Sequence, residues 1–80
     1  MNLYVGNLPP ETMDYDLEAA FGQFGKVGAA RVAIDRQTGK SRGFAFVDMA
    51  SKVESDAAIQ AMNGKDYKGR MLTVNEARSR

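Results

Sequence analysis

The chain has 80 residues, a formal net charge of +1, no cysteine and no histidine. This length allows one domain with a modest core, and the missing residue types exclude disulfides, thiol catalysis, the commonest metal ligand and the commonest general base. No segment approaches the ~20 apolar residues of a membrane span, and the N-terminus lacks the features of a secretory signal, so we expect a cytoplasmic protein.

The first predicted element is a half-buried strand over residues 2–6. Its alternation places Leu3 and Val5 on one face and Tyr4 on the other. A loop with two prolines follows, and Thr12 is then expected to cap a helix that ends at the next glycine after its apolar stripe. This stripe comprises Leu17, Ala20, Phe21 and Phe24. Tyr15, on the same helix, is expected to be partly packed at its boundary.

Two further strands are predicted in the middle of the chain. Residues 29–35 alternate, and residues 36–41, RQTGKS, read as a polar, basic turn. The apolar face of the first of these strands comprises Ala30, Val32 and Ile34. Residues 42–49, RGFAFVDM, form the next strand, in which an arginine and two phenylalanines share one face while small or apolar residues share the other.

A second helix and a last strand complete the pattern. Ser51 and Glu54 fit a reciprocal capping box, and the helix ends at a glycine after Asn63. The inward residues of this helix are Ala58, Ile59 and Met62. Residues 65–70, KDYKGR, are expected to be a basic loop in which Tyr67 is partly packed. Leu72 and Val74 alternate in the final strand.

The order β-α-β-β-α-β predicts an α+β, ferredoxin-like sandwich. Two right-handed β-α-β units interleave into a four-stranded antiparallel sheet with the first and third strands in the middle, and both helices back one face. The predicted core comprises Leu3, Val5, Ala30, Val32, Ile34, Ala45, Val47, Leu72 and Val74 from the sheet, with Leu17, Phe21, Phe24, Ile59 and Met62 from the helices.

Three aromatic side chains are left on the uncovered face of this sheet. Tyr4, Phe44 and Phe46 lie on its two central strands, and each exposed ring forgoes roughly 1.5–3 kcal/mol of burial. A cluster of this kind on an open sheet indicates a binding partner.

The RGFAFVDM strand resembles the octamer K/R-G-F/Y-G/A-F-V-x-F/Y of the RNA recognition motif family at every position but the last, where Met49 faces inward. Residues 3–8, LYVGNL, are similar to the companion hexamer of the first strand. The chain is thereby identified as a member of this family, with residues 1–80 as a single domain. It looks most like stand-alone proteins of bacteria and cyanobacteria and the RNA-binding part of plant glycine-rich proteins.

The resemblance implies that the open face binds single-stranded RNA, with single-stranded DNA as a second candidate ligand. Tyr4 and Phe44 would each stack on a base, Phe46 would lie against sugars, and Arg42 would pair with a phosphate. Further contacts are implied for Asn2, Arg31, Asn75, the backbone around Ala77, and Arg78. These roles agree with general physics, since a π face accepts any base and guanidinium suits phosphate. The expected process is post-transcriptional regulation or RNA chaperoning.

Other readings of the same residues stay open. The exposed aromatics also fit a protein-binding surface or a dimer interface, and the basic side chains of residues 65–70 fit either a solvated loop or an RNA clamp. An enzyme is disfavoured, because residues 7–14, NLPPETMD, contain no basic residue to cradle a phosphate and no activated nucleophile can be assembled. We expect a monomer with no catalysis, no cofactor, no metal and no membrane contact.

Charge is segregated along the sequence. Residues 1–25 carry four acidic side chains and no lysine or arginine, whereas residues 26–48 and residues 65–80 each carry five basic and two acidic side chains. Such segregation fits either solvated faces or a basic surface for an acidic partner.

Overall fold

The computed structural model describes residues 2–77 and confirms the predicted β-α-β-β-α-β order, to which it adds a short two-stranded hairpin before the last strand. The elements are β1 (Asn2–Gly6), α1 (Asp14–Phe21), β2 (Val27–Ile34), β3 (Ser41–Met49), α2 (Lys52–Met62), β4 (Asp66–Tyr67), β5 (Arg70–Met71) and β6 (Thr73–Glu76). Four strands form an antiparallel sheet in the order β2-β3-β1-β6, while β4 and β5 pair separately. The predicted α+β, ferredoxin-like fold is therefore confirmed.

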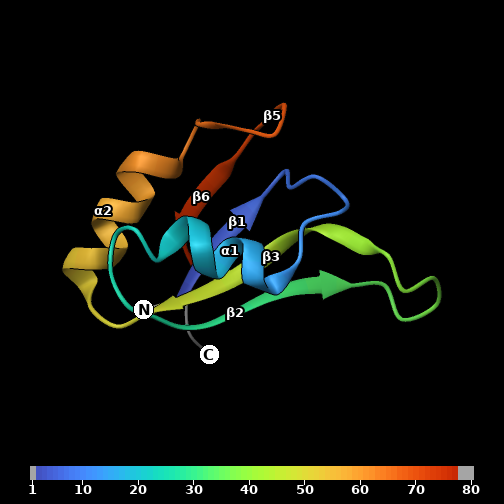
Figure 1. The fold of residues 1–80 in the computed structure, drawn as a ribbon, viewed down its shortest axis with the longest axis horizontal. Helices are drawn as coiled ribbons and strands as arrows, with labels where there is room; N and C mark the ends of the chain where they lie inside the picture. Colours follow the sequence, from blue (N-terminus) through green and yellow to red (C-terminus); the bar gives the residue numbers. More distant parts are fainter. Residues whose placement is uncertain (1, 78–80) are drawn as a thin grey trace.

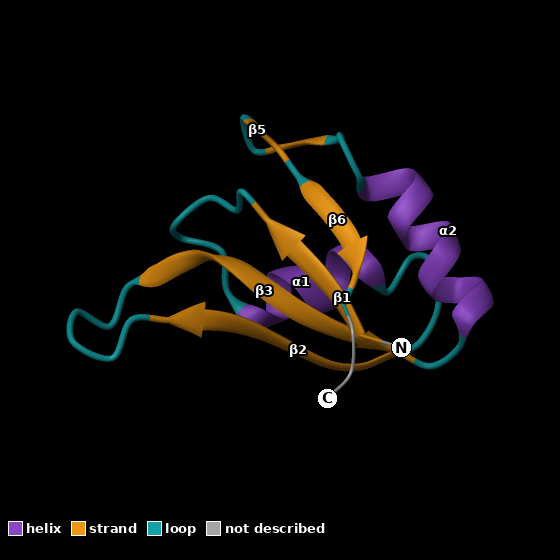
Figure 2. Cartoon of the chain, turned by 180° about the vertical axis from the view of Figure 1, so that it is seen from behind, coloured by secondary structure: helices purple, strands orange, loops and turns teal. Residues whose placement is uncertain are grey.

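Both helices lie on the same face of the sheet. Figure 1 shows α1 in front of the strands, and the view from behind in Figure 2 shows the strands in front of α1. The first helix contacts β2, and α2 contacts β6. No helix or strand within residues 2–77 covers the opposite face, which is turned toward the viewer in Figure 2. We refer to it as the open face.

Eleven of the fourteen predicted core residues are buried, and Leu8 is buried although it was not predicted. The buried apolar residues are Leu3, Val5, Leu8, Leu17, Phe21, Ala30, Val32, Ala45, Val47, Met49, Ala58, Met62, Leu72 and Val74. Phe24 and Ile59 are only partly buried against this cluster. The placement of Ile34 in the core is wrong, because this side chain is 51% exposed. The β2–β3 register shifts between Val32 and Ile34, at the end of β2.

The start of α1 also differs from the prediction. Thr12 does not cap the helix; Met13 occupies the N-cap position, and its backbone N–H donates to Oδ2 of Asp16 at 2.8 Å. The Asp16 carboxylate, three residues after the N-cap, thus makes the contact to the N-cap backbone N–H that Glu or Gln makes in a capping box. Thr12 is buried, and its hydroxyl has no hydrogen-bond partner among residues 2–77. The helix ends at Phe21 rather than Phe24, because a glycine directly after Phe21 weakens helix propagation.

The capping box predicted for α2 is half correct. The Oγ of Ser51 accepts the backbone N–H of Glu54 at 3.2 Å, as predicted. The Glu54 carboxylate does not return to Ser51, since its Oε1 accepts the backbone N–H of Lys26 at 3.3 Å. A Cβ at Gly25 would overlap the Glu54 side chain, so a glycine at this position leaves room for the carboxylate. The helix ends as predicted at a left-handed glycine, Gly64, with φ of 80°.

Residues 65–70 are more ordered than the predicted basic loop. They contribute to a short hairpin in which Tyr67 pairs with Arg70. The two residues of its turn, Lys68 and Gly69, have φ of 51° and 90°, as a type I′ turn requires. Tyr67 packs against the core as expected, whereas Tyr15 is 67% exposed and is not packed. In the part of the chain that the structure describes, neither helix is long and apolar enough to cross a membrane.

Candidate nucleic-acid interface

One row of paired residues crosses the whole open face. Tyr4 on β1 pairs with Asn75 on β6 and with Phe46 on β3, and Phe46 in turn pairs with Arg31 on β2. Paired residues project to the same side of a sheet, so these four side chains share the open face. Four residues predicted from separate strands are thereby brought into one line.

The aromatic triad, comprising Tyr4, Phe44 and Phe46, lies at the centre of the open face. Ring centroids are 5.9 Å apart for Tyr4 and Phe44, and 6.0 Å apart for each of the other two pairs. The planes of Tyr4 and Phe44 differ by only 30°, whereas Phe46 stands at 64° and 86° to them. Phe46 is 44% exposed, and the other two rings are half-buried. The triad therefore presents two rings tilted by 30° to each other and one ring that stands upright against them.

A glycine allows the tyrosine ring to adopt this position. Gly6 pairs with Phe44 across the β1–β3 ladder, and a Cβ placed on Gly6 would lie 2.7 Å from the Tyr4 hydroxyl oxygen. The tyrosine ring thus lies along β1, over the glycine and toward Phe44. A larger residue at this position would force the ring to move.

Arg42 lies beside the triad, as predicted. The guanidinium carbon of Arg42 is 5.5 Å from the centroid of the Phe44 ring, within cation–π range. Between them, Gly43 has φ of 87°, and its carbonyl accepts the backbone N–H of Leu8 at 2.9 Å. The left-handed glycine is thus tied to the segment after β1, and Arg42 remains exposed at the start of β3.

The remaining predicted contacts lie at one end of this surface or outside the described residues. Asn2 is exposed and pairs with Asp48, and the Asn2 carbonyl accepts the backbone N–H of Ala77 at 2.8 Å. The N–H of Ala77 is therefore occupied by the backbone of β1. Arg78 lies outside residues 2–77. The RNA contacts of all these residues stay predictions.

Sequence reasoning missed a link between the first loop and the β4–β5 hairpin. Asn7 has φ of 62°; its Nδ2 donates to the Met71 carbonyl at 2.8 Å, and its Oδ1 accepts from Nη1 of Arg70 at 3.3 Å. The Asn7 side chain, directly after the end of β1, thus holds the guanidinium of Arg70. The one signal in the sequence was an asparagine in the loop that also holds two prolines, since asparagine tolerates left-handed backbone.

The described residues offer no metal site. Within residues 2–77, no group of three or more histidine, cysteine, aspartate or glutamate side chains is placed to hold a metal ion. What the open face offers instead is a set of π surfaces flanked by guanidinium groups and side-chain amides.

Comparison with known proteins gives one consistent family. The family model described as RNA recognition motif matches residues 3–73. RbpE of Nostoc sp. is 46% identical over 80 residues, which cover 100% of this chain and 81% of the relative. The glycine-rich RNA-binding protein blt801 of Hordeum vulgare is 49% identical over 77 residues, which cover 96% of this chain and 48% of that protein. The crystal structure of RNA Binding Protein PG1 superposes with a TM-score of 0.97 at 44% identity, covering 100% of this chain and 96% of that one.

Proposed function

Because the chain belongs to the RNA recognition motif family, we propose that it binds single-stranded RNA on the open face of its sheet. The names of two similar proteins, blt801 and PG1, describe RNA binding. The observation that carries the proposal is the row Asn75–Tyr4–Phe46–Arg31, which crosses all four strands beside Phe44. This row combines stacking rings, a side-chain amide and a guanidinium within one continuous surface.

The ring geometry supports a division of roles within the triad. Tyr4 and Phe44, with planes 30° apart and centroids separated by 5.9 Å, present neighbouring platforms for two bases. Phe46 stands upright against both rings and therefore suits a sugar between the bases. Stacking on an aromatic side chain is worth about 1–3 kcal/mol per base and tolerates any base. Two to four nucleotides would be bound in this way.

Charged and amide groups around the triad supply the remaining contacts. Arg42 beside Phe44 and Arg31 at the β2 end of the row suit backbone phosphates, because guanidinium forms paired hydrogen bonds with phosphate oxygens. Asn75 at the β6 end has an amide that both donates and accepts, which suits the edge of a base. Asn2, the carbonyl of Ala77, and Arg78 complete the proposed surface.

The same surface implies a role for the whole chain. Residues 1–80 act as one domain that binds RNA as a monomer in the cytoplasm, without catalysis or a cofactor, in post-transcriptional regulation or RNA chaperoning. Single-stranded DNA is the weaker candidate ligand. Aromatic rings stack equally well on its bases, but DNA has no 2′-hydroxyl for the protein to contact.

A salt-dependent titration with a fluorescent random RNA octamer tests this proposal. We expect affinity to fall between about 50 and 200 mM salt and to be lower for the matching DNA. The variant Tyr4→Ala should weaken binding, while Tyr15→Ala, which removes an exposed tyrosine away from the open face, should not. Equal affinity of the wild type and Tyr4→Ala, or binding that does not respond to salt, would reject this use of the open face.

A further inference from the structure

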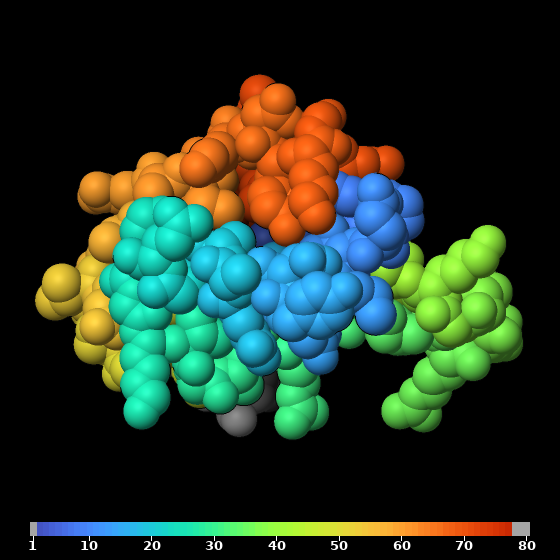
Figure 3. Space-filling view, in the orientation of Figure 1, coloured from blue at the N-terminus to red at the C-terminus, as the bar shows by residue number. Residues whose placement is uncertain are grey.

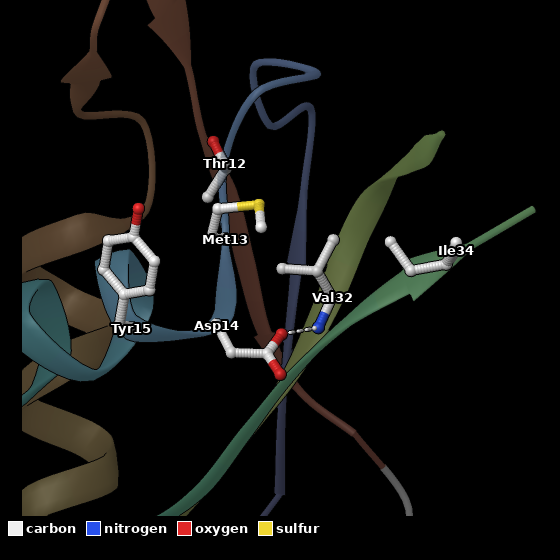
Figure 4. Close-up of a pocket in the computed structure, with 6 residues that line it drawn as sticks. All are labelled: Thr12, Met13, Asp14, Tyr15, Val32 and Ile34. Atoms are coloured by element: carbon white, nitrogen blue, oxygen red, sulfur yellow. Dashed lines mark hydrogen bonds between the residues drawn. The ribbon is translucent and has the colours of Figure 1, made fainter. Parts of the chain in front are cut away.

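A concave surface lies on the helix-covered side of the molecule, away from the aromatic triad. The pocket has a volume of about 340 Å³ and is formed by the segment that opens α1 and by the edge strand β2 (Figure 4). Its lining residues are Thr12, Met13, Asp14, Tyr15, Val32 and Ile34. This volume is near the lower end of the roughly 300–1,000 Å³ found for ligand pockets, and it suits one large side chain better than an extended ligand.

Large apolar side chains around this pocket are left in contact with water. Met13, Tyr15 and Ile34 are 52%, 67% and 51% exposed, although they come from two separate segments of the chain. Ile34 lies beyond the register shift in β2, so its side chain is exposed, whereas that of Val32 is buried in the core. Apolar surface that gathers from two segments indicates a contact that is completed by another molecule.

The charge of the segment that forms the pocket is acidic. Asp14 lines the pocket, Glu11, Asp16 and Glu18 lie within four residues of it in the sequence, and residues 1–25 contain no lysine or arginine. Oδ1 of Asp14 accepts the backbone N–H of Val32 at 2.8 Å, which fixes this carboxylate at the pocket wall (Figure 4). A neighbouring hollow beyond Ile34 is mixed in charge, since Asp35, Arg36 and Arg42 line it, whereas the carboxylates at the start of α1 make their own surroundings acidic. Such a field repels phosphate and attracts cationic groups.

We propose that this pocket docks a protein partner through a short basic segment that carries one large apolar side chain. The apolar side chain enters between Met13 and Ile34, and the basic residues face the carboxylates at the start of α1. Docking by side chains is favoured over strand addition, because the outward N–H of Val32 is already occupied by Asp14. The inference goes beyond RNA binding and does not depend on it.

The two surfaces allow simultaneous occupation. Val32 turns into the core beneath the pocket, whereas the preceding residue, Arg31, pairs with Phe46 and projects from the open face. Figure 3 views the molecule from the side of the helices, where residues of the α1 segment occupy the centre of the surface. A partner seated there would leave the aromatic triad accessible from the other side.

A methyl-resolved NMR titration of the 80-residue chain tests this inference with defined probes. The probe is the pentapeptide RRWRR, blocked at both ends; RRARR lacks the apolar anchor, and EEWEE reverses the charge. We expect the methyl signals of Met13, Val32 and Ile34 to shift and saturate with RRWRR below about 1 mM, and not with the two control peptides. Shifts centred on the open face, or equal responses to RRWRR and EEWEE, would overturn the proposal.

Matched variants separate the pocket from generic peptide adhesion. Ile34→Ala removes a pocket wall, and Val53→Ala removes a similar exposed side chain from α2, where Val53 is 79% exposed. Asp14→Asn removes the charge but keeps an acceptor for Val32, and Asp56→Asn is its control on α2. Ile34→Ala and Asp14→Asn should each weaken RRWRR binding about two- to fivefold, and the controls should not. Equal losses from all four variants would refute the pocket.

Two further measurements decide between occupants. In sedimentation experiments at rising protein concentration, we expect the chain to stay monomeric. Self-association that Ile34→Ala abolishes would show that a second copy of the chain, and not a partner protein, occupies the pocket. An RNA octamer should leave the methyl signal of Met13, which lines this pocket and not the hollow beside Arg42, unchanged, and a shift comparable to that of the triad would show that nucleic acid occupies the pocket. Either result overturns the proposed occupant.

Discussion

The rings of Tyr4 and Phe46 meet edge to face across the β1–β3 pair, with centroids 6.0 Å apart and planes at 64°. The adjacent pair in the same ladder, Leu3 and Val47, is fully buried on the opposite face. A slip of one residue in this register would send the rings into the core and the aliphatic pair into water. The packing of the core therefore fixes the geometry of the open face.

Val47→Asp is expected to unfold the domain. Val47 is fully buried within β3, so the substitution would place a carboxylate without a partner among apolar side chains. Circular dichroism should show loss of the cooperative thermal transition. A folded variant with a normal transition would mean that the two faces of β3 are assigned the wrong way round.

Triad residues and core residues should respond in opposite ways to truncation. Tyr4→Ala and Phe44→Ala should each weaken RNA binding by about 1–3 kcal/mol. Because each ring contacts the other two, we expect each to lower stability by only about 0.5–1.5 kcal/mol. Phe21→Ala, which opens a cavity at a fully buried position, should lower stability by ~3–5 kcal/mol.

Melting curves and RNA titrations on these variants provide the comparison, with Tyr15→Ala as the control for an exposed ring outside the open face. A loss of stability in Phe44→Ala as large as in Phe21→Ala would show that the ring belongs to the core. Normal RNA affinity in both triad variants would instead favour a protein partner for the open face.

The main features of the fold and the open face were predictable because they depend on simple periodicity. Alternation placed Leu3 and Val47 inside and Tyr4 and Phe46 outside, and the sequence order of the strands made β1 and β3 neighbours. Both inferences need only the direction of successive side chains in a strand and the handedness of the crossover.

The predictions failed where two residues could make the same local contact, where the strand pairing shifts, or where segments distant in the sequence meet. Thr12 and Asp16 both suit the start of α1, and only the structure shows that the carboxylate provides the contact. A register shift near the end of β2 exposes Ile34, and period-two reasoning cannot foresee such a shift. The contact between Asn7 and Arg70 joins segments 63 residues apart, so no local pattern reports it.

Arg42→Ala should weaken binding to all RNA sequences to a similar extent. The guanidinium lies beside Phe44 and is proposed to contact a phosphate, so its loss should reduce the slope of log affinity against log salt by about 0.7. Arg42→Lys keeps the charge and should retain the slope while losing the planar contact with the ring. An unchanged slope in Arg42→Ala, accompanied by a change in sequence preference, would indicate that Arg42 reads a base.

Gly6→Ala should weaken RNA binding through the tyrosine ring and leave the fold intact. A Cβ at this position would lie 2.7 Å from the Tyr4 hydroxyl oxygen, which is the far end of a flexible side chain, so we expect the ring to move. The φ of Gly6 is not positive, so alanine fits the strand and should not lower stability appreciably. The loss of affinity should stay below the ~1–3 kcal/mol of a complete stacking contact.

A double-mutant cycle with Tyr4→Ala tests this mechanism. If alanine at position 6 acts by displacing the ring, it should have little further effect once the ring is absent, and the two losses should not add. Gly28→Ala is the matched control, because a Cβ at that strand glycine would meet its nearest neighbour, the Asp48 side chain, at 3.4 Å. RNA titrations on the four members of the cycle give the coupling energy. Additive losses would show that Gly6 acts independently of Tyr4, by allowing the ligand itself to approach the backbone of β1.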